Sequence, residues 1–220
     1  MNSALAGIGM TSLRTRMRMI DKLRRQGVRN EAVLEAMATV PRHIFVDEAL
    51  NSRAYEDMAL PLGFGQTISQ PYVVARMIEA LLGARPGLGK TLEIGTGCGY
   101  QTAVLGKLTR DVYSVERIAP LLARAEQHLK RIPGVSARLR HADGSIGFPE
   151  AAPFDSIIVA AAARQVPPAL LQQLAVEGCL ILPLGDKEQY LCHIQRTLQG
   201  FAETRLEKVR FVPLLSGIES

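Results

Sequence analysis

Four residues near the middle of the chain have the types and spacing of a ligand site. Gly95, Gly97 and Gly99 follow an apolar run, and Glu116 lies 21 positions after Gly95. Glycines at the end of a buried strand let the backbone turn tightly and approach a ligand closely. A carboxylate at the end of the next strand can accept hydrogen bonds from both hydroxyls of a ribose. The pattern predicts that Gly95, Gly97 and Glu116 bind a ribose-bearing ligand.

Three ligand classes compete for this glycine loop, and a turn that serves packing alone is a fourth interpretation. A dinucleotide fold needs a third glycine where this chain has Tyr100. The run "ARPGLGKT" at 84–91 resembles a phosphate-binding loop, but it precedes a strand instead of following one. S-adenosylmethionine carries a ribose and no phosphate, so glycine contact and one ribose acid suffice. The sequence therefore favours S-adenosylmethionine as the cofactor, with S-adenosylhomocysteine as the product.

A further acid lies within "HADGSIGF" at 141–148, directly after another predicted strand. Ligands of open α/β sheets collect at the carboxyl edge of the strands, where Asp143 and Gly144 should lie. Asp143 could contact the adenine amine of the cofactor. It could equally form an Asx turn before Gly144. Both interpretations stay open from the sequence.

The polar run "GFGQTISQP" at 63–71 precedes a segment with helical spacing. Its amide and hydroxyl groups can hold a substrate carboxylate and the cofactor. Gln66, Thr67, Ile68 and Ser69 are therefore candidate cofactor-binding residues. Ser69 could instead serve only as the N-cap of the following helix, a role worth about 1 kcal/mol of stability.

A carboxylate is the methyl acceptor that these residues favour. A terminal carboxyl has a pKa of about 3.5, so it is ionised at neutral pH and needs no general base. Positioning such a group can contribute on the order of 7–11 kcal/mol. Residues 160–165 ("AAAARQ") lack the polar-Pro-Pro-aromatic motif of many nucleic-acid methyltransferases, and no cysteine follows a proline. Nucleic acid is thus not the expected partner, although seven basic residues crowd positions 14–29.

The elements that must position these residues change character near residue 90. Before it, three helices are predicted. The first carries an apolar stripe of Leu13, Met17, Ile20 and Leu23, with its basic residues elsewhere on the helix. Asn30 should cap the second helix and Pro41 should end it. The third should begin at Ser69 or Gln70, with Pro71 in its first turn.

After residue 90, strands alternate with helices, which predicts parallel pairing through right-handed crossovers. The strands are expected at 90–95, 111–116, 136–142, 154–160 and 179–185, and the helices near 99–108, 119–130 and 167–175. Residues 189–196 and 203–214 predict an antiparallel hairpin at the sheet edge, with 209–215 as a strand whose end lies near a peptide site. The fold class is α/β: a Rossmann-like S-adenosylmethionine-dependent methyltransferase sandwich. Its mostly parallel sheet carries an antiparallel C-terminal hairpin and an N-terminal helical cap. We expect one methyltransferase domain over 1–220, with the cap and ligand loop at 1–89 and the core at 90–220.

The composition indicates the cellular compartment and argues against metal and membrane binding. Three cysteines without C-x-x-C spacing indicate a reducing compartment and predict no zinc site. The four histidines have no triad-like or metal-like spacing and are expected to be structural. The longest apolar run has far fewer than the ~20 residues of a membrane helix, and "ALAGIGM" lacks the basic region of a signal peptide. We therefore expect a cytoplasmic monomer that binds no membrane and no metal.

Several segments closely resemble one enzyme family. They are "TVPRHIFVDEAL" (39–50), "LPLGFGQTISQPYVVARM" (60–77), "LEIGTGCGYQTAVL" (92–105), "VYSVERI" (112–118), "APFDSIIVAAA" (152–162) and "VRFVPLLSG" (209–217). In collinear order from about Thr11 onward, they resemble protein-L-isoaspartate O-methyltransferases. "QTISQP" and "RFVPL" are specific to that family. Residues 1–9 have no counterpart in the resemblance, which leaves Met10 as an alternative start.

The resemblance implies methyl transfer from S-adenosylmethionine to the free α-carboxylate of L-isoaspartyl residues in damaged proteins and peptides. The ester then closes to a succinimide, whose hydrolysis restores some normal linkages. The residue matching Ser69 is the one that the family designates catalytic, within a segment matching 66–69 that folds over cofactor and substrate. The resemblance assigns Gly95, Gly97, Glu116, Asp143 and Gly144 to the cofactor.

The chain departs from the family pattern at a few positions. Cys98 replaces a familiar serine, Ala142 replaces a common glycine, and Phe64 stands where a polar residue is frequent. Residues 160–167 lack a threonine and a proline that are often present. Two alternatives to the implied activity remain: methylation of another acceptor, either nucleic acid or a small carboxylate, and a non-catalytic binding module on the same fold.

Overall fold

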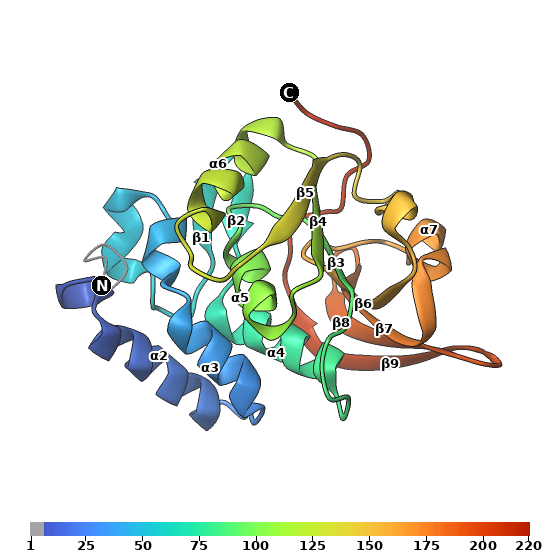
Figure 1. The fold of residues 1–220 in the computed structure, drawn as a ribbon, viewed down its shortest axis with the longest axis horizontal. Helices are drawn as coiled ribbons and strands as arrows, with labels where there is room; N and C mark the ends of the chain where they lie inside the picture. The colour runs from blue at the N-terminus through green and yellow to red at the C-terminus, as the bar shows by residue number, and fades with distance from the viewer. Residues whose placement is uncertain (1–6) are drawn as a thin grey trace.

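A seven-stranded sheet forms the centre of the computed structural model, which describes residues 7–220 (Figure 1). The strands have the order β5-β4-β3-β6-β7-β8-β9. Their bounds are β3 (Thr91–Ile94), β4 (Val112–Glu116), β5 (Ala137–His141), β6 (Phe154–Val159), β7 (Leu174–Gly185), β8 (Gln189–Thr197) and β9 (Gly200–Val209). Pairing is parallel from β5 through β7, and antiparallel between β7, β8 and β9. The predicted fold class, including the C-terminal hairpin, is confirmed.

Apolar cores cover both faces of this sheet, because successive residues of a strand point to opposite faces. Ile158 and Ile181 belong to one hydrophobic cluster, whereas their neighbours Ile157 and Leu180 belong to the other. The crossovers are α5 (Tyr100–Leu108), α6 (Ala119–Leu129), the short η4 (Pro149–Ala151) and α7 (Pro168–Gln172). Helix α7 ends earlier than predicted because β7 already begins at Leu174, five residues before the predicted strand start.

The N-terminal part forms a layer of helices against α4 and α5, visible in blue in Figure 1. Its elements are η1 (Gly9–Thr11), α2 (Leu13–Arg25), α3 (Glu31–Thr39), η2 (Arg42–Phe45) and η3 (Glu48–Arg53), and the helix α4 beneath it spans Pro71–Leu82. The predicted cap of α3 is confirmed, since Asn30 accepts a hydrogen bond from the Val33 N–H at 3.2 Å. Residues 1–6, part of the segment predicted to lie outside the family resemblance, are outside the described residues.

The prediction of an apolar stripe on α2 is wrong for the N-terminal half of the helix. Leu13 and Met17 are 57% and 39% exposed, while Arg16 is 5% exposed and faces the protein. The Arg16 guanidinium donates to the Tyr55 hydroxyl at 3.1 Å and to the Ala38 carbonyl at 3.1 Å. Carbonyls at the end of a helix carry negative partial charge and attract a cation. A polar network at the end of α3 thus replaces hydrophobic contact at this position.

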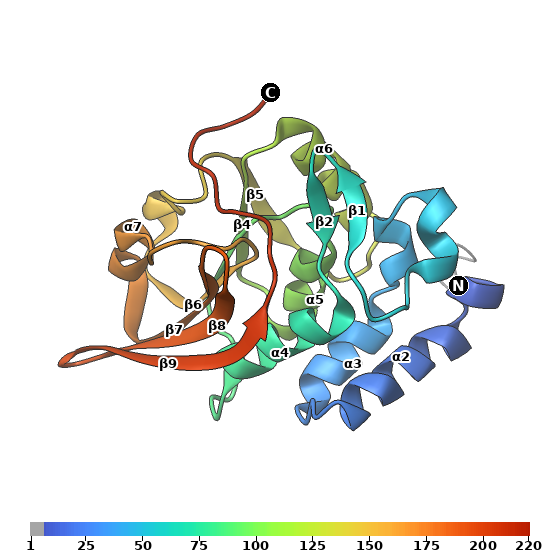
Figure 2. The ribbon, with the colours of Figure 1, turned by 180° about the vertical axis from the view of Figure 1, so that it is seen from behind.

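The polar run before α4 holds a small hairpin that the sequence analysis did not predict as strands. Strands β1 (Leu60–Gly63) and β2 (Gln66–Ile68) pair antiparallel with each other and form a sheet of their own. Phe64 and Gly65 make the turn, with φ of 53° and 67°. A left-handed backbone is ordinary for glycine and rare for phenylalanine. Figure 2 shows this hairpin on the same side of the molecule as the C-terminal segment.

Candidate active site

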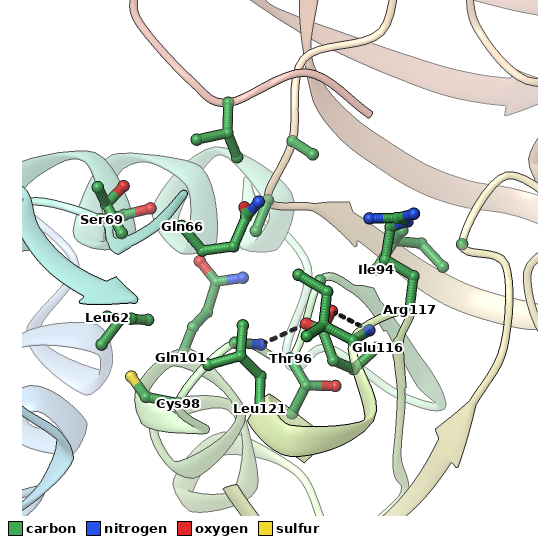
Figure 3. A pocket seen from close by; sticks show the side chains of 18 of the residues that line it. Leu62, Gln66, Ser69, Ile94, Thr96, Cys98, Gln101, Glu116, Arg117 and Leu121 are labelled. Carbon is green, nitrogen blue, oxygen red and sulfur yellow. Dashed lines mark hydrogen bonds between the residues drawn. The ribbon is translucent and has the colours of Figure 1, made fainter. Parts of the chain in front are cut away.

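A cavity lies where the chain leaves the carboxyl ends of β3, β4 and β6 (Figure 3). It encloses about 850 Å³, part of it open to solvent. The strand order reverses between β3 and β6, and open α/β sheets bind their ligands at such switch points. Eight of the nine predicted binding residues line it: Gln66, Thr67, Ile68, Ser69, Gly95, Gly97, Glu116 and Gly144. Asp143 does not line it.

Backbone shape explains the glycines of the loop. Gly95 and Gly97 have φ of 92° and 55°, in the left-handed region where a side chain is strained. The backbone there forms the floor of the cavity. At position 144 a glycine is required by space and not by backbone conformation, because a Cβ there would lie 2.5 Å from Cγ2 of Ile94. A side chain would therefore be strained at Gly95 and Gly97 and would clash at Gly144.

Glu116 is buried at the end of β4 with its carboxylate toward the cavity, as Figure 3 shows. Its Oε2 accepts the Gly97 N–H at 2.8 Å, and its Oε1 accepts the Ile118 N–H at 3.0 Å. Each carboxylate oxygen has a second lone pair. The two backbone bonds therefore orient Glu116 and leave both oxygens able to accept a ligand hydroxyl.

Asp143 has the geometry of the turn interpretation. Its Oδ1 accepts the Ser145 N–H at 2.8 Å and the Ser145 hydroxyl at 2.6 Å, and its Oδ2 accepts the Gly217 N–H at 2.6 Å. Partial burial opposes ionisation, but these bonds, led by the one from Gly217, hold the pKa of Asp143 below its ordinary value. Its adenine contact stays a prediction, and its observed contacts fix the C-terminal segment.

Ser69 lies between β2 and α4 and lines the cavity. The capping interpretation is not supported by the geometry: the residue before α4 is Gln70, and no side chain caps that helix. Figure 3 places Ser69 and Gln66 on one side of the cavity, with Glu116 and Arg117 on the other. The predicted polar run therefore forms a wall opposite Glu116.

The C-terminal segment supplies one wall of the cavity, and the prediction of a strand over 209–215 is wrong. Strand β9 ends at Val209, and no regular strand covers 210–215. Instead, Ala162 donates to the Val212 carbonyl and Leu214 donates to the Ala162 carbonyl, each at 2.8 Å. These bonds seat residues 212–215 along the cavity, and all four line it. The backbone of this segment is extended, as the prediction of a strand requires. Among residues 7–220, its backbone hydrogen bonds go only to Ala162 and not to a neighbouring strand, so it does not extend the sheet.

Arg117 fastens the end of that segment and also lines the cavity. It donates to the Gly217 carbonyl at 3.2 Å and to the Glu219 carboxylate at 2.9 Å. Its own carbonyl accepts the Glu219 N–H at 2.7 Å. Sequence reasoning missed this role, because nothing local marks an arginine whose partners lie about a hundred positions away.

A second buried acid supports the loop from beneath. Glu93 in β3 is fully buried and accepts hydrogen bonds from Gln101 at 3.0 Å, Thr102 at 2.5 Å and Ser114 at 2.6 Å. Burial raises the pKa of Glu93 to about 7, although these hydrogen bonds oppose the rise. Gln101 lines the cavity, and Ser114 is also bonded to Thr96 of the loop at 2.6 Å. Glu93 thus joins β3, β4, α5 and the glycine loop.

Comparison with known proteins identifies the family. The sequence profile described as protein-L-isoaspartate(D-aspartate) O-methyltransferase matches residues 14–219. The protein-L-isoaspartate O-methyltransferase of Dechloromonas aromatica is 67% identical over 98% of this chain and all of that one. Its counterpart in Methylobacillus flagellatus is 58% identical over 98% of each chain. This chain belongs to the protein-L-isoaspartate O-methyltransferase family.

Solved structures agree with this assignment. A protein-L-isoaspartate O-methyltransferase superposes with a TM-score of 0.83 at 26% identity, covering 93% of this chain and 67% of that one. A Plasmodium falciparum structure, described as a β-aspartate methyltransferase in complex with S-adenosyl-L-homocysteine, gives a TM-score of 0.78 at 26% identity. That match covers 91% of this chain and 98% of the other. The resemblance inferred from the motifs is confirmed.

In this isoaspartate methyltransferase a groove adjoins the cavity. It is lined by residues of 59–73 on one side and 207–212 on the other. Thr67, Ser69, Ala160 and Val212 line both the groove and the cavity. Ser69 therefore lies where an occupant of the groove meets an occupant of the cavity. Ala160 contributes only a methyl group there, in the segment that departs from the family pattern.

The four histidines and Arg164 line neither the cavity nor the groove. His43, His128 and His141 contact the Tyr55 hydroxyl, the Cys98 carbonyl and the Arg117 carbonyl. Within residues 7–220, no three His, Cys, Asp or Glu side chains are grouped so that they could hold a metal ion. The side chain of Arg164 is 82% exposed and pairs with Asp186. No helix in the described part of the chain is long and apolar enough to span a membrane.

Proposed function

We propose that this protein transfers a methyl group from S-adenosylmethionine to the free α-carboxylate of L-isoaspartyl residues in damaged proteins and peptides. The observation that carries this proposal is the junction of cavity and groove at Ser69, with the buried carboxylate of Glu116 on the far side of the cavity. Membership in the isoaspartate methyltransferase family supports it. The ester formed then closes to a succinimide, from which repair proceeds.

The residues present fit the cofactor. The backbone of Gly95 and Gly97 would carry its amino-acid and ribose portions, and Glu116 would accept the two ribose hydroxyls. The backbone at Gly144, where a Cβ would strike Ile94, would lie against the adenine. When bound, S-adenosylmethionine supplies a methyl group activated by its positively charged sulfur. Gln66, Thr67 and Ile68 would close the side next to the acceptor.

The acceptor side needs placement instead of a base. No histidine lines the cavity or the groove within the described residues. Burial raises the pKa of the Cys98 thiol to about 11 and that of the Tyr100 hydroxyl to about 12, so both keep their protons at neutral pH. The substrate carboxylate is already ionised. One of its oxygens forms the new bond to the methyl carbon while the sulfur–carbon bond breaks, so no proton moves.

Ser69 is assigned to hold that carboxylate. Its hydroxyl can donate one charge-assisted hydrogen bond, and residues of the hairpin and of the C-terminal segment line the cavity beside it. Removing a hydrogen bond to a charged group costs about 1.5–3 kcal/mol. Ser69→Ala should therefore lower kcat/KM for the peptide about ten- to a hundredfold, while Ser69→Thr keeps the hydroxyl and most of the activity. Equal activity of Ser69→Ala and wild type would refute the assignment.

The function is tested with labelled methyl donor and two peptides that differ only in an isoaspartyl or aspartyl linkage. Methyl uptake by the isoaspartyl peptide alone is the expected result. Uptake by RNA, DNA or a small carboxylate, without uptake by the peptide, would establish another acceptor. Binding of S-adenosylhomocysteine without any transfer would show a binding module.

A further inference from the structure

One wall of the groove carries three charged residues, and only one of them is without an ionic partner. Glu207 accepts a hydrogen bond from Nε of Arg76 at 3.0 Å. Lys208 pairs with Glu188 at 2.6 Å. Arg210 is exposed, and among residues 7–220 no ion pair or side-chain hydrogen bond joins it. The charge of Arg210 is therefore available to whatever enters the groove.

The opposite wall does not balance this charge. It consists of Ala59, Gln70, Tyr72 and Val73, none of which is charged, in addition to the residues shared with the cavity. The half-buried Asp57 contacts the backbone of this wall and does not line the groove. Its two oxygens accept the Tyr72 N–H at 2.9 Å and the Gln26 amide at 2.7 Å. The groove thus has one uncompensated positive charge, and it lies on the β9 side.

We propose that Arg210 selects isoaspartyl sites that have an acidic residue beside them in the sequence. The inference rests on the proposed function, because the occupant of the groove is taken to be the substrate peptide with its isoaspartyl carboxylate at Ser69. A guanidinium offers a planar pair of donors that matches a carboxylate, and it stays charged at every physiological pH. A neighbouring glutamate or aspartate side chain is the group that can use them.

The expected size of the effect is modest, because the pair is exposed to solvent. Exposed ion pairs usually contribute enough to change an equilibrium about two- to fivefold. Screening by salt weakens such pairs, so the preference should shrink at high ionic strength. A lysine beside the isoaspartyl residue should be disfavoured by a similar factor, because two cations would then share the groove.

The test uses isoaspartyl peptides that are identical except for Glu, Gln or Lys at the position before or after the isoaspartyl residue. The readout is the ratio of kcat/KM between peptides at low and high ionic strength. Wild type should prefer Glu over Gln and Gln over Lys, each about two- to fivefold at low salt on at least one side. Arg210→Lys should keep the order, Arg210→Gln should abolish it, and Arg210→Glu should reverse it.

A matched control is Arg164→Gln, which removes an exposed arginine that lines neither the cavity nor the groove. It should retain the wild-type order of peptides. Equal kcat/KM for all peptides in wild type, or a preference for Glu that persists in Arg210→Gln, would overturn the role of Arg210 and leave the proposed function intact. Failure of wild type to methylate any isoaspartyl peptide would instead overturn the proposed function itself.

Discussion

Replacing Glu93 by glutamine should change how the stability of the protein depends on pH. Glu93 is fully buried, and burial raises its pKa from an ordinary 4.5 to about 7. In the unfolded chain the carboxyl loses its proton near pH 4.5, whereas in the folded protein it keeps the proton until about pH 7. Between these values the folded state binds more protons, so stability falls as pH rises.

The magnitude follows from the two pKa values. Each pKa unit corresponds to about 1.4 kcal/mol, and the pKa of Glu93 rises by about 2.5 units on folding. The unfolding free energy of the wild type should therefore be about 3 kcal/mol lower well above pH 7 than well below pH 4.5, as far as Glu93 alone is concerned. The stabilising contribution is complete below pH 4.5 and lost above about pH 7. Glutamine cannot ionise, and it keeps the size of the side chain. It provides one acceptor oxygen fewer for Thr102 and Ser114, which adds a cost that does not vary with pH.

The assay is urea unfolding of both proteins at constant ionic strength over pH 5 to 8, with the free energy extrapolated to water. The difference between Glu93→Gln and wild type removes the titration of other groups. These include His128 and His193, whose pKa values are lowered by burial and which therefore change stability with the opposite sign. The unfolding free energy of Glu93→Gln minus that of wild type should increase by on the order of 2–3 kcal/mol from pH 5 to pH 8.

An exposed acid serves as the control. The hydrogen bond from Lys208 lowers the pKa of Glu188, so this side chain is ionised in both the folded and the unfolded protein above pH 5. Glu188→Gln should accordingly differ from wild type by a constant amount over this range. Two parallel curves for Glu93→Gln and wild type would refute the reasoning, because they would show that Glu93 titrates alike in both states.

Three further predictions concern the cofactor site and the helical layer. Glu116→Gln places an N–H₂ group against a backbone N–H, and calorimetry should show S-adenosylhomocysteine affinity reduced about ten- to a hundredfold; unchanged affinity would remove Glu116 from the site. Arg117→Ala releases the C-terminal wall from Glu219 and should weaken the same binding about two- to fivefold, whereas tighter binding would show that the wall obstructs the ligand. Asn30→Ala should lower the unfolding free energy by about 1 kcal/mol, and Asn30→Asp should restore it; equal losses in denaturant titrations would argue against the cap.

The parts of the site that the sequence predicted are those encoded locally. Gly95, Gly97 and Glu116 lie at the ends of consecutive strands, so their spacing along the chain already determines their proximity in space. The alternation of strands and helices likewise predicted the order of the core. Ser69 was predicted as a candidate from its polar neighbours, and only the structure could show that it does not cap α4.

The parts that the sequence did not predict depend on contacts between distant segments. Arg16 looked like one more residue of a solvated basic face, because hydrophobic periodicity cannot register a buried guanidinium with polar partners. Residues 212–215 looked like a strand because an extended backbone and a strand have the same sequence pattern. Asp143 was placed correctly at the sheet edge, but its bond to Gly217 could not be inferred, since that partner lies 74 positions away.

The cavity takes its two covering walls from segments far apart along the chain, 62–69 and 212–215. A ligand held between them would act as a reversible crosslink that joins the first third of the protein to its last ten residues. Binding would then raise the resistance of both segments to proteolysis and hydrogen exchange together, by a factor that increases with ligand concentration. A cut in either segment would abolish this protection in the other.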